Sequence, residues 1–315
     1  MLLGCIDTNE SRLAANDVSK ESIASADNFS ETEPFSLVDS WVGDLDEIEE
    51  RRILRILTVY GPGRFYLDGA VGKGIVAEMS QRFEEYLNER LERGHLRIQV
   101  VNIPVARNQL IPALLSGYGD LISAGLTNTE ERQKLVDFSI AASKPVSEIL
   151  VTGPSAPEIK TIEDLSGETL YIRRSSSYFD SAVALNLRFT EKAKPPIKLE
   201  PVSELLEDDD LIEMVNGGLL PWAIVDDYKP ILWKEVFKNL VVRNDIIFRE
   251  RGSLAWGMRK NSPHLKKMVD SFLLKNREGT LIGNILHNRY VRDFDYAGNA
   301  LDNADFQRFE KVVEL

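Results

Sequence analysis

The chain has 315 residues, 43% of them hydrophobic, which suits a globular protein of about two domains. Its 38 basic and 50 acidic residues give a net charge of −12, which argues against nucleic acid as a partner. One cysteine and three histidines offer neither a disulfide framework nor a predicted metal site, and no apolar run approaches the roughly 20 residues of a membrane span. We expect neither a metal nor a cofactor.

The chain begins with "MLLGC", whose last four residues resemble a bacterial lipobox, in which the cysteine becomes the lipidated first residue. The charged and apolar signal regions that precede a lipobox are missing from the sequence. Residues 6–35 are rich in Ser, Asn, Asp and Glu, which is typical of a solvated tether. A chance cysteine after two leucines is the alternative. We predict that residues 1–35 are a lipobox remnant and a disordered tether, with Cys5 as the lipidation site.

The next part of the chain alternates between strand and helix patterns. An apolar strand lies within residues 52–61 and is closed by a Gly-Pro-Gly turn. The helix that follows, within residues 74–94, has apolar residues at four-residue spacing: Ile75, Met79, Phe83, Leu87 and Leu91. Further patterns predict a strand at 96–101, a helix at 107–119 with Leu110, Ile111, Leu114 and Leu115 inward, and a strand at 120–125. This order implies a parallel sheet covered by helices.

From about residue 148 the same rhythm restarts, although the two halves share no visible sequence repeat. Strands are predicted at 169–174, 197–202, 221–227 and 239–243, and helices at 176–189, 211–218 and 228–237. Residues 252–276 add one more strand and helix, which could pack on either half. We predict an α/β fold with two lobes, each a mostly parallel sheet flanked by helices. Residues 36–147 and 249–294 form lobe 1, and residues 148–248 form lobe 2.

Polar side chains follow the ends of strands in both halves. Thr127 and Arg132 come just after the strand at 120–125, where a hydroxyl and a guanidinium can hold a carboxylate at two points. In the second half, residues 175–177 are serines between a strand and a helix, so their hydroxyls and the helix amides can receive an anion. Asp226 ends another strand and offers the opposite charge. Because ligands bind at the carboxyl ends of strands in such sheets, a cleft between the lobes is predicted.

Each of these residues also has a structural alternative. A serine at a helix start is often only an N-cap. Asp226 can cap the helix that begins near Tyr228. Arg132 can pair on a solvated turn, for ~0–1 kcal/mol, with one of three neighbouring acids: Glu130, Glu131 or Asp137. The joint placement of these residues at strand ends in two lobes favours a ligand site.

The stretch "GDLISAGLTNTEERQKLVDFS" resembles the signature of the family 3 extracellular solute-binding proteins, the periplasmic amino-acid receptors. The resemblance implies a two-lobed, type II periplasmic-binding-protein-like fold. It also implies that Thr127 and Arg132 bind the α-carboxylate of the ligand and that Asp226 binds its α-amino group. The remaining members of the predicted site are Tyr60, Ala124, Gly125, Ser175, Ser176 and Ser177. Closure is expected at two hinge segments, 142–148 and 247–253.

Three further arginines complete the predicted site. By alignment to the receptor family, Arg107 stands where an aromatic residue often covers the ligand side chain, and Arg173 and Arg174 lie beside the serines. In a protein of net charge −12 these arginines suggest a ligand with more than one carboxylate, such as a peptidoglycan stem peptide. The alternative is that Arg107 and Arg174 bind neighbouring acids outside the cleft.

A narrower resemblance covers nearly the whole chain. The segments "WVGDLDEIEERRILRILTVY", "RRSSSYFDSAVALN", "LIEMVNGGLLPWAIVDD" and "ERGSLAWGMRKNSPHLK" are similar to the N-terminal module of the membrane-bound lytic transglycosylase F family. This resemblance implies a periplasmic protein that is lipid-anchored at the outer membrane, in agreement with Cys5. It further implies a separate C-terminal catalytic domain of lysozyme type, while the receptor-like module senses cell-wall peptide fragments.

The chain ends about where that catalytic domain should begin, and we expect residues 295–315 to be a tail leading toward it. No candidate for the catalytic glutamate remains, because glycosidase chemistry needs positioned carboxyl groups and the acids at 207–210 resemble a solvated loop before a helix. We therefore predict a module that binds an amino acid or muropeptide, does not catalyse, and regulates an attached transglycosylase. The alternatives are a free amino-acid receptor of an ABC transporter and a ligand-free structural anchor.

Overall fold

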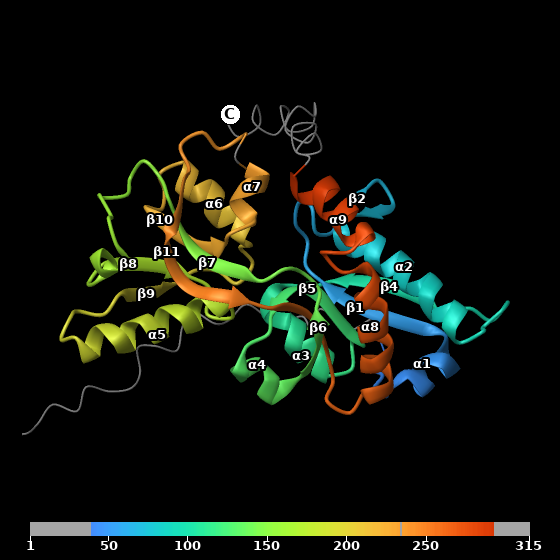
Figure 1. The fold of residues 1–315 in the computed structure, drawn as a ribbon. Helices are drawn as coiled ribbons and strands as arrows, with labels where there is room; N and C mark the ends of the chain where they lie inside the picture. Colours follow the sequence, from blue (N-terminus) through green and yellow to red (C-terminus); the bar gives the residue numbers. More distant parts are fainter. Residues whose placement is uncertain (1–38, 234, 293–315) are drawn as a thin grey trace, which may run out of the picture. The chain divides into compact units, whose positions relative to one another are not determined.

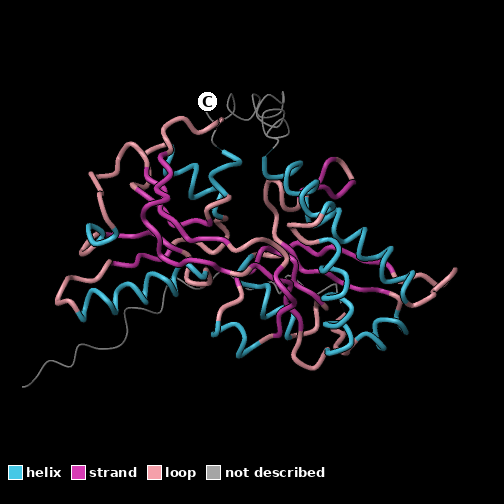
Figure 2. The backbone as a smooth tube through the Cα atoms, in the orientation of Figure 1, coloured by secondary structure: helices cyan, strands magenta, loops and turns pink. Residues whose placement is uncertain are grey.

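The structure is a computed structural model that describes residues 39–233 and 235–292. The predicted lipidation site Cys5, the tether and the tail at 295–315 lie outside the described residues. Helices and strands alternate along the described chain (Figures 1 and 2). Among these helices, none is both long and apolar enough to cross a membrane.

The first sheet has five strands in the order β4-β1-β5-β12-β6. The strands β4 (Gln99–Pro104), β1 (Ile53–Thr58) and β5 (Leu121–Thr127) are parallel, as the alternating pattern predicts. In contrast, β12 (Leu254–Met258) runs antiparallel to both β5 and β6 (Asp137–Ala141). Because β12 belongs to this sheet, the strand predicted within residues 252–276 packs on the first half and not on the second. We call the part built on this sheet the first lobe.

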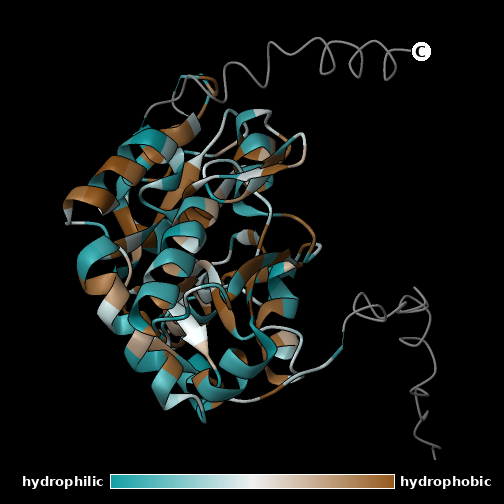
Figure 3. Ribbon diagram, turned by 90° about the vertical axis from the view of Figure 1, so that its right-hand side faces the viewer, coloured by the Kyte–Doolittle hydropathy of each residue, from teal (hydrophilic) through white to brown (hydrophobic). Residues whose placement is uncertain are grey.

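Two amphipathic helices supply much of the core of the first lobe. Helix α2 (Ile75–Arg90) buries Met79, Phe83 and Leu87 at the predicted spacing, and α8 (Pro263–Asn276) packs beside it. Figure 3 shows both hydrophobic and hydrophilic stretches on the helical ribbons, as expected for helices with one face on a core. The prediction for Leu115 is wrong. It ends the short helix α3 (Leu110–Leu115), whose buried face is formed by Leu110, Ala113 and Leu114, and it is 44% exposed.

The main sheet of the second lobe contains the strands predicted at 221–227 and 239–243 and a middle strand that the sequence pattern did not predict. Strand β7 (Val146–Thr152) lies between β10 (Trp222–Asp226) and β11 (Val241–Gly252) and is antiparallel to both. Among the described residues of this lobe, the parallel pair is formed by β8 (Thr169–Ile172) and β9 (Lys198–Pro201). The helices of this lobe are α5 (Ser177–Glu191), α6 (Asp208–Asn216) and α7 (Lys229–Trp233). Apolar side chains from β7, α5 and α6 fill its two core clusters.

The chain passes between the two lobes at two places. Residues 142–145 connect β6 to β7, and Ser253 connects β11 to β12. Both connections fall within the segments expected to act as hinges. Shorter elements complete the described fold: α1 (Leu45–Arg51), β2 (Tyr66–Asp68), β3 (Val71–Lys73), η1 (Arg107–Gln109), α4 (Glu130–Leu135), η2 (Ile162–Leu165), α9 (Leu281–His287) and η3 (Asn288–Arg292).

Candidate ligand-binding site

The end of β5 and the start of α4 place Thr127 and Arg132 together. Thr129 caps α4 by accepting a hydrogen bond from the backbone N–H of Arg132 (3.3 Å), which turns the chain sharply after the strand. The guanidinium of Arg132 then points back, and its Nη1 donates to the carbonyl oxygen of Thr127 (2.9 Å). Its Nη2 donates to the carbonyl oxygen of Ser175 in the second lobe (2.9 Å). The arginine thus joins both lobes through backbone oxygens.

Arg132 has no ion pair within the described part of the chain. Of the three acids that could have paired with it, Glu131 instead contacts Lys134 (2.5 Å), and neither Glu130 nor Asp137 forms a salt bridge with it. Burial, together with the nearby charge of Arg107, lowers the pKa of Arg132 to about 10, and the carboxylates of Asp180 and Glu148 oppose this decrease without forming an ion pair with it. The half-buried guanidinium is therefore held by neutral carbonyl oxygens, which is an incomplete arrangement for a charge with no ion pair among the described residues.

The three serines of the second lobe have different contacts. Ser177 donates from its hydroxyl to that of Thr127 across the lobes (3.2 Å). Ser176 is the N-cap of α5, where it accepts from the backbone N–H of Phe179 (3.2 Å), so the structural alternative applies to it. Ser175 donates from its hydroxyl to Glu204. Ser177 is therefore the member of the triplet whose side chain lies beside Thr127.

Asp226 ends β10 and is only 3% exposed. Its Oδ1 is buried and has no hydrogen-bond partner among the described residues. Burial raises the pKa of Asp226 to about 7; Lys229 opposes this increase, and Asp208 and Glu148 add to it. A carboxylate oxygen without a hydrogen-bond partner accepts a hydrogen bond from any donor that reaches it, such as a ligand ammonium group.

Glu148 is a second buried acid beside Asp226, and the sequence interpretation missed it. The two residues are register partners on β10 and β7, and opposite residues in an antiparallel pair lie close together on one face. Ser181 donates to Oε2 of Glu148, whereas the buried Oε1 has no hydrogen bond within the described chain and lies 3.8 Å from Nε of Arg249. Burial raises the pKa of Glu148. The sequence signal that could have identified Glu148 is an acidic residue inside the apolar stretch "VSEILV".

Arg107 forms a salt bridge across the lobes. Its guanidinium contacts the carboxylate of Glu207 at three distances between 2.7 and 3.1 Å, and its Nη1 donates to the carbonyl oxygen of Ala124 (3.2 Å). Burial by itself lowers the pKa of Arg107, but the carboxylates of Glu207 and Asp208 raise it overall. In this conformation the charge of Arg107 is already compensated by the protein.

The acids at 207–210 do not form the solvated loop that the sequence suggested. Glu207 is the N-cap of α6, and Asp208 is the first residue of that helix and only 2% exposed. Asp208 forms ion pairs with Arg173 and Lys229 and accepts a hydrogen bond from the hydroxyl of Tyr178 (3.0 Å). Burial alone would raise the pKa of Asp208, but Lys229 and Arg173 hold it well below its usual range. These partners come from other elements, which explains the error.

The other predicted site residues differ in their exposure and contacts. Arg174 is exposed, unlike Arg173, and the ring of Tyr60 is 51% exposed and lies 5.8 Å from that of Phe65. Ala124 contributes its carbonyl oxygen, as described above. Gly125 has a φ of +61°, and a Cβ at this position would lie 2.2 Å from Nη1 of Arg64. Arg64 is a further cleft residue that the sequence interpretation missed.

Residues 56–290 match the model of the bacterial extracellular solute-binding proteins, family 3. The chain belongs to this family. A curated relative, the membrane-bound lytic murein transglycosylase F of Shewanella frigidimarina, is 29% identical over 265 residues, which are 81% of this chain and 51% of the relative. The protein of the same name from Pseudomonas fluorescens is 26% identical over 260 residues, 81% of this chain and 49% of the relative. The chain therefore spans about half the length of the curated relatives it matches.

Solved structures show the same fold at low sequence identity. The P235GK mutant of ArgBP from T. maritima has a TM-score of 0.60 and 18% identity, covering 78% of this chain and 97% of that one. An amino acid ABC transporter substrate-binding protein, AbpA from Streptococcus pneumoniae, also has a TM-score of 0.60 and 18% identity, covering 80% and 98%. These likenesses confirm the predicted two-lobed type II fold of an α/β solute-binding protein.

Proposed function

We propose that this chain is a sensing module that captures an amino acid or cell-wall stem peptide by its carboxylate and thereby regulates an attached peptidoglycan lytic transglycosylase. The observation that carries the proposal is Arg132, a half-buried guanidinium that joins both lobes and forms no ion pair with a carboxylate of the described residues. A ligand carboxylate supplies the missing charge and can accept two parallel hydrogen bonds from the guanidinium.

The proposed mechanism assigns one ligand group to each set of side chains. The carboxylate binds to Arg132 and the hydroxyl of Thr127, and closure of the second lobe adds Ser177 and the amide end of α5. The ligand ammonium group binds to Oδ1 of Asp226, which otherwise lacks a partner among the described residues. Closure about residues 142–145 and Ser253 is driven only by contacts that the closed form makes and the open form lacks.

Two observations favour this proposal over the alternatives. A ligand-free structural anchor is expected to have a blocked or apolar cleft, whereas the half-buried Arg132 and the buried Asp226 and Glu148 bring ionisable groups to the lobe boundary. A receptor for a transporter needs no attached enzyme, whereas the curated relatives are named as transglycosylases and are about twice as long as the matched region. The fold alone, shared with transporter receptors, does not separate these two functions.

The carboxylate assignment is tested with Arg132→Gln. Titration calorimetry with free amino acids and stem peptides should identify a ligand of the wild-type chain and show at least 30-fold weaker binding to the variant, on the scale of about 2 kcal/mol or more for a buried charge pair. Arg188→Gln removes the same charge from the exposed side of α5 and should bind like wild type. Unchanged affinity in Arg132→Gln contradicts the assignment.

The regulatory and anchoring parts of the proposal require the natural full-length protein. Addition of the ligand identified by calorimetry should change the rate of glycan-strand cleavage, and Arg132→Gln should abolish that response while leaving the rate without ligand unchanged. A response that survives in the variant argues against regulation through this site. Intact mass of the protein isolated from membranes tests the proposed lipid on Cys5, because an unmodified mass contradicts the predicted outer-membrane anchor.

A further inference from the structure

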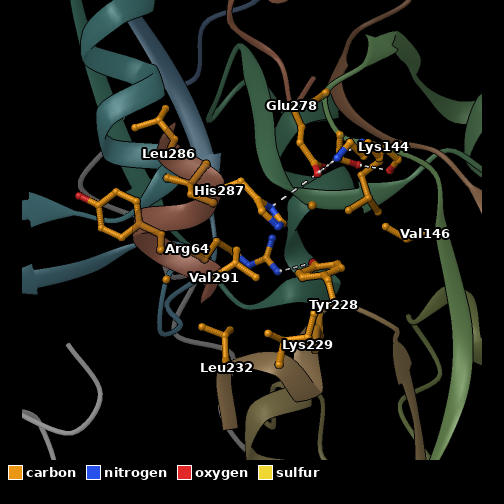
Figure 4. A pocket seen from close by; sticks show the side chains of 18 of the residues that line it. Arg64, Lys144, Val146, Tyr228, Lys229, Leu232, Glu278, Leu286, His287 and Val291 are labelled. Carbon is orange, nitrogen blue, oxygen red and sulfur yellow. Dashed lines mark hydrogen bonds and ion pairs between the residues drawn. The ribbon is translucent and has the colours of Figure 1, made fainter. Parts of the chain in front are cut away.

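A large cavity lies beside the proposed carboxylate site and is lined by residues of both lobes. Its volume is about 700 Å³, within the range of pockets that hold drug-sized ligands. Apolar side chains such as Met79, Trp256, Leu232 and Leu286 form much of its wall. Figure 4 shows Arg64 and Tyr228 joined by a hydrogen bond in this cavity, with Leu232 and Val291 beside them. A free amino acid would leave most of this space empty.

The cavity and the carboxylate site meet along β5. Gly125 lines the cavity, and Thr127 follows two residues later in the same strand. Because Gly125 has no side chain, the guanidinium of Arg64 can lie directly against the strand. A ligand bound to Thr127 and Arg132 can therefore extend along β5 toward Arg64 without leaving the cleft.

Arg64 resembles Arg132 in having no ion pair with any described residue. Its Nη2 donates a hydrogen bond to the hydroxyl oxygen of Tyr228 in the second lobe (3.2 Å). The neighbouring cations differ, since Lys229 is paired with Asp208 and Lys144 with Glu278 (3.5 Å). A neutral phenol does not compensate the charge of Arg64, and its proton is available to a further acceptor.

The acids of the cavity wall are already bound to protein donors. Oδ1 of Asp209 accepts from the indole N–H of Trp233 (2.6 Å), and Oδ2 of Asp227 accepts from the backbone N–H of Ser147 (3.1 Å). Glu278 accepts from the backbone N–H of Lys144 (3.0 Å). None of these carboxylates forms a salt bridge with Arg64 in the described structure, so the guanidinium is open to an external anion.

We propose that Arg64 and the hydroxyl of Tyr228 form a second anion-binding point, and that the ligand is a dianion whose second carboxylate reaches it along β5. This inference rests on the proposed function, because it places the first carboxylate on Arg132. Arg64 belongs to the first lobe and Tyr228 to the second, so the second carboxylate adds contacts that exist only when the lobes are closed. The apolar wall accommodates the part of the ligand between its two charged ends.

The test uses pairs of ligands that differ only by one charge. Glutamate and glutamine form one pair, and the dipeptides Ala-Glu and Ala-Gln form the other; each is titrated into the wild-type chain, Arg64→Gln, Arg64→Lys and Arg132→Gln. We expect the wild-type chain to bind the acid of at least one pair about tenfold or more tightly than its amide, as for hydrogen bonds to charged groups. Arg64→Gln should lose this preference, and Arg64→Lys should keep part of it.

The two proposals fail in different ways in this experiment. If Arg132→Gln weakens both members of a pair but Arg64→Gln keeps the acid preference, the second anion point is wrong and the proposed function stands. If the wild-type chain binds the acid and the amide of each pair equally, or binds none of the four compounds, the second anion-binding point is contradicted. The proposed function is contradicted only if the free amino acids and stem peptides of the calorimetric titrations also fail to bind. Arg188→Gln is the charge-matched control, and the melting temperature of every variant shows that a lost preference is not a loss of folded protein.

Discussion

Arg173 is buried and Arg132 is half-buried; both lie at the lobe boundary, but the protein surrounds them differently. Arg173 forms an ion pair with Asp208, which also binds Lys229 and the hydroxyl of Tyr178. Arg132 contacts two backbone oxygens and no acid within the described residues. Buried charges are normally paired, because leaving one uncompensated is costly.

This difference separates charges that organise the fold from charges that we propose bind a ligand. The Asp208 cluster, which we define as Asp208, Arg173, Lys229 and Tyr178, lies within the second lobe and joins α6 to α7, α5 and the residue that follows β8. Arg132 and Asp226 instead come from different lobes. Among the described residues, Arg132 lacks an ion pair and Oδ1 of Asp226 lacks a hydrogen-bond donor, and a ligand with a carboxylate and an ammonium group could supply both. We therefore expect mutations in the two groups to affect different measurements.

The largest effect is expected for stability when Asp208 is replaced by Asn. The change leaves Arg173 and Lys229 buried with one fewer carboxylate, and removing one partner from a buried pair typically costs about 3–5 kcal/mol. Urea unfolding should show a decrease of this size in the free energy of unfolding. Asp68→Asn, at an exposed pair with Lys73, is the matched control and should change it little. A decrease in Asp208→Asn as small as in the control would show that the cluster does not hold the lobe together.

A slightly smaller and pH-dependent effect is expected for Asp226→Asn. In the folded protein the pKa of Asp226 is raised from 3.8 to about 7, so the folded state keeps a proton that the unfolded state has already released. The free energy of unfolding of the wild-type protein therefore falls as the pH rises from about 4 to about 7, with an upper limit of about 4 kcal/mol for this group. Below this range both states are protonated and the effect is absent.

Asp226→Asn removes that dependence. The variant should unfold with nearly the wild-type free energy at pH 4, and it should be more stable than the wild-type protein at pH 8. Parallel urea titrations at the two pH values measure the difference. Ligand binding by the wild-type protein should also release a proton near pH 6, since an ammonium group favours the ionised carboxylate. Equal pH dependence in the two proteins would mean that Asp226 titrates normally.

The sequence predicted the elements whose pattern is local. Helix α2 is an example, because its buried residues recur every four positions and the helix needs no distant partner to be recognised. Thr127 and Arg132 were predicted for the same reason, since a strand end and a short turn bring them together within five residues. The local sequence motif was therefore enough to predict that Thr127 and Arg132 lie close together.

The sequence did not predict the contacts that depend on distant partners. Arg107 and Glu207 are 100 positions apart, so the pairing that compensates the predicted ligand-binding arginine was not visible. Asp208 looked solvated because Arg173 and Lys229, which bury and neutralise it, come from other elements. Strand β7 was missed for a similar reason, since its two antiparallel neighbours are β10 and β11, more than 60 residues later in the chain. Glu148 was missed with it.

The smallest effects are expected at two adjacent serines at the start of α5. They test the distinction between structural and ligand-binding groups at one helix end. Ser176→Ala removes the N-cap of α5 and should lower the free energy of unfolding by about 1 kcal/mol with little change in ligand affinity. Ser177→Ala removes the hydroxyl next to Thr127, so it should weaken ligand binding by about fivefold and leave stability nearly unchanged. Calorimetry and urea unfolding on both variants give the two measurements. If Ser176→Ala weakened binding as much as Ser177→Ala, the cap itself would be part of the ligand site, and the separation between structural and ligand-binding groups would not hold at α5.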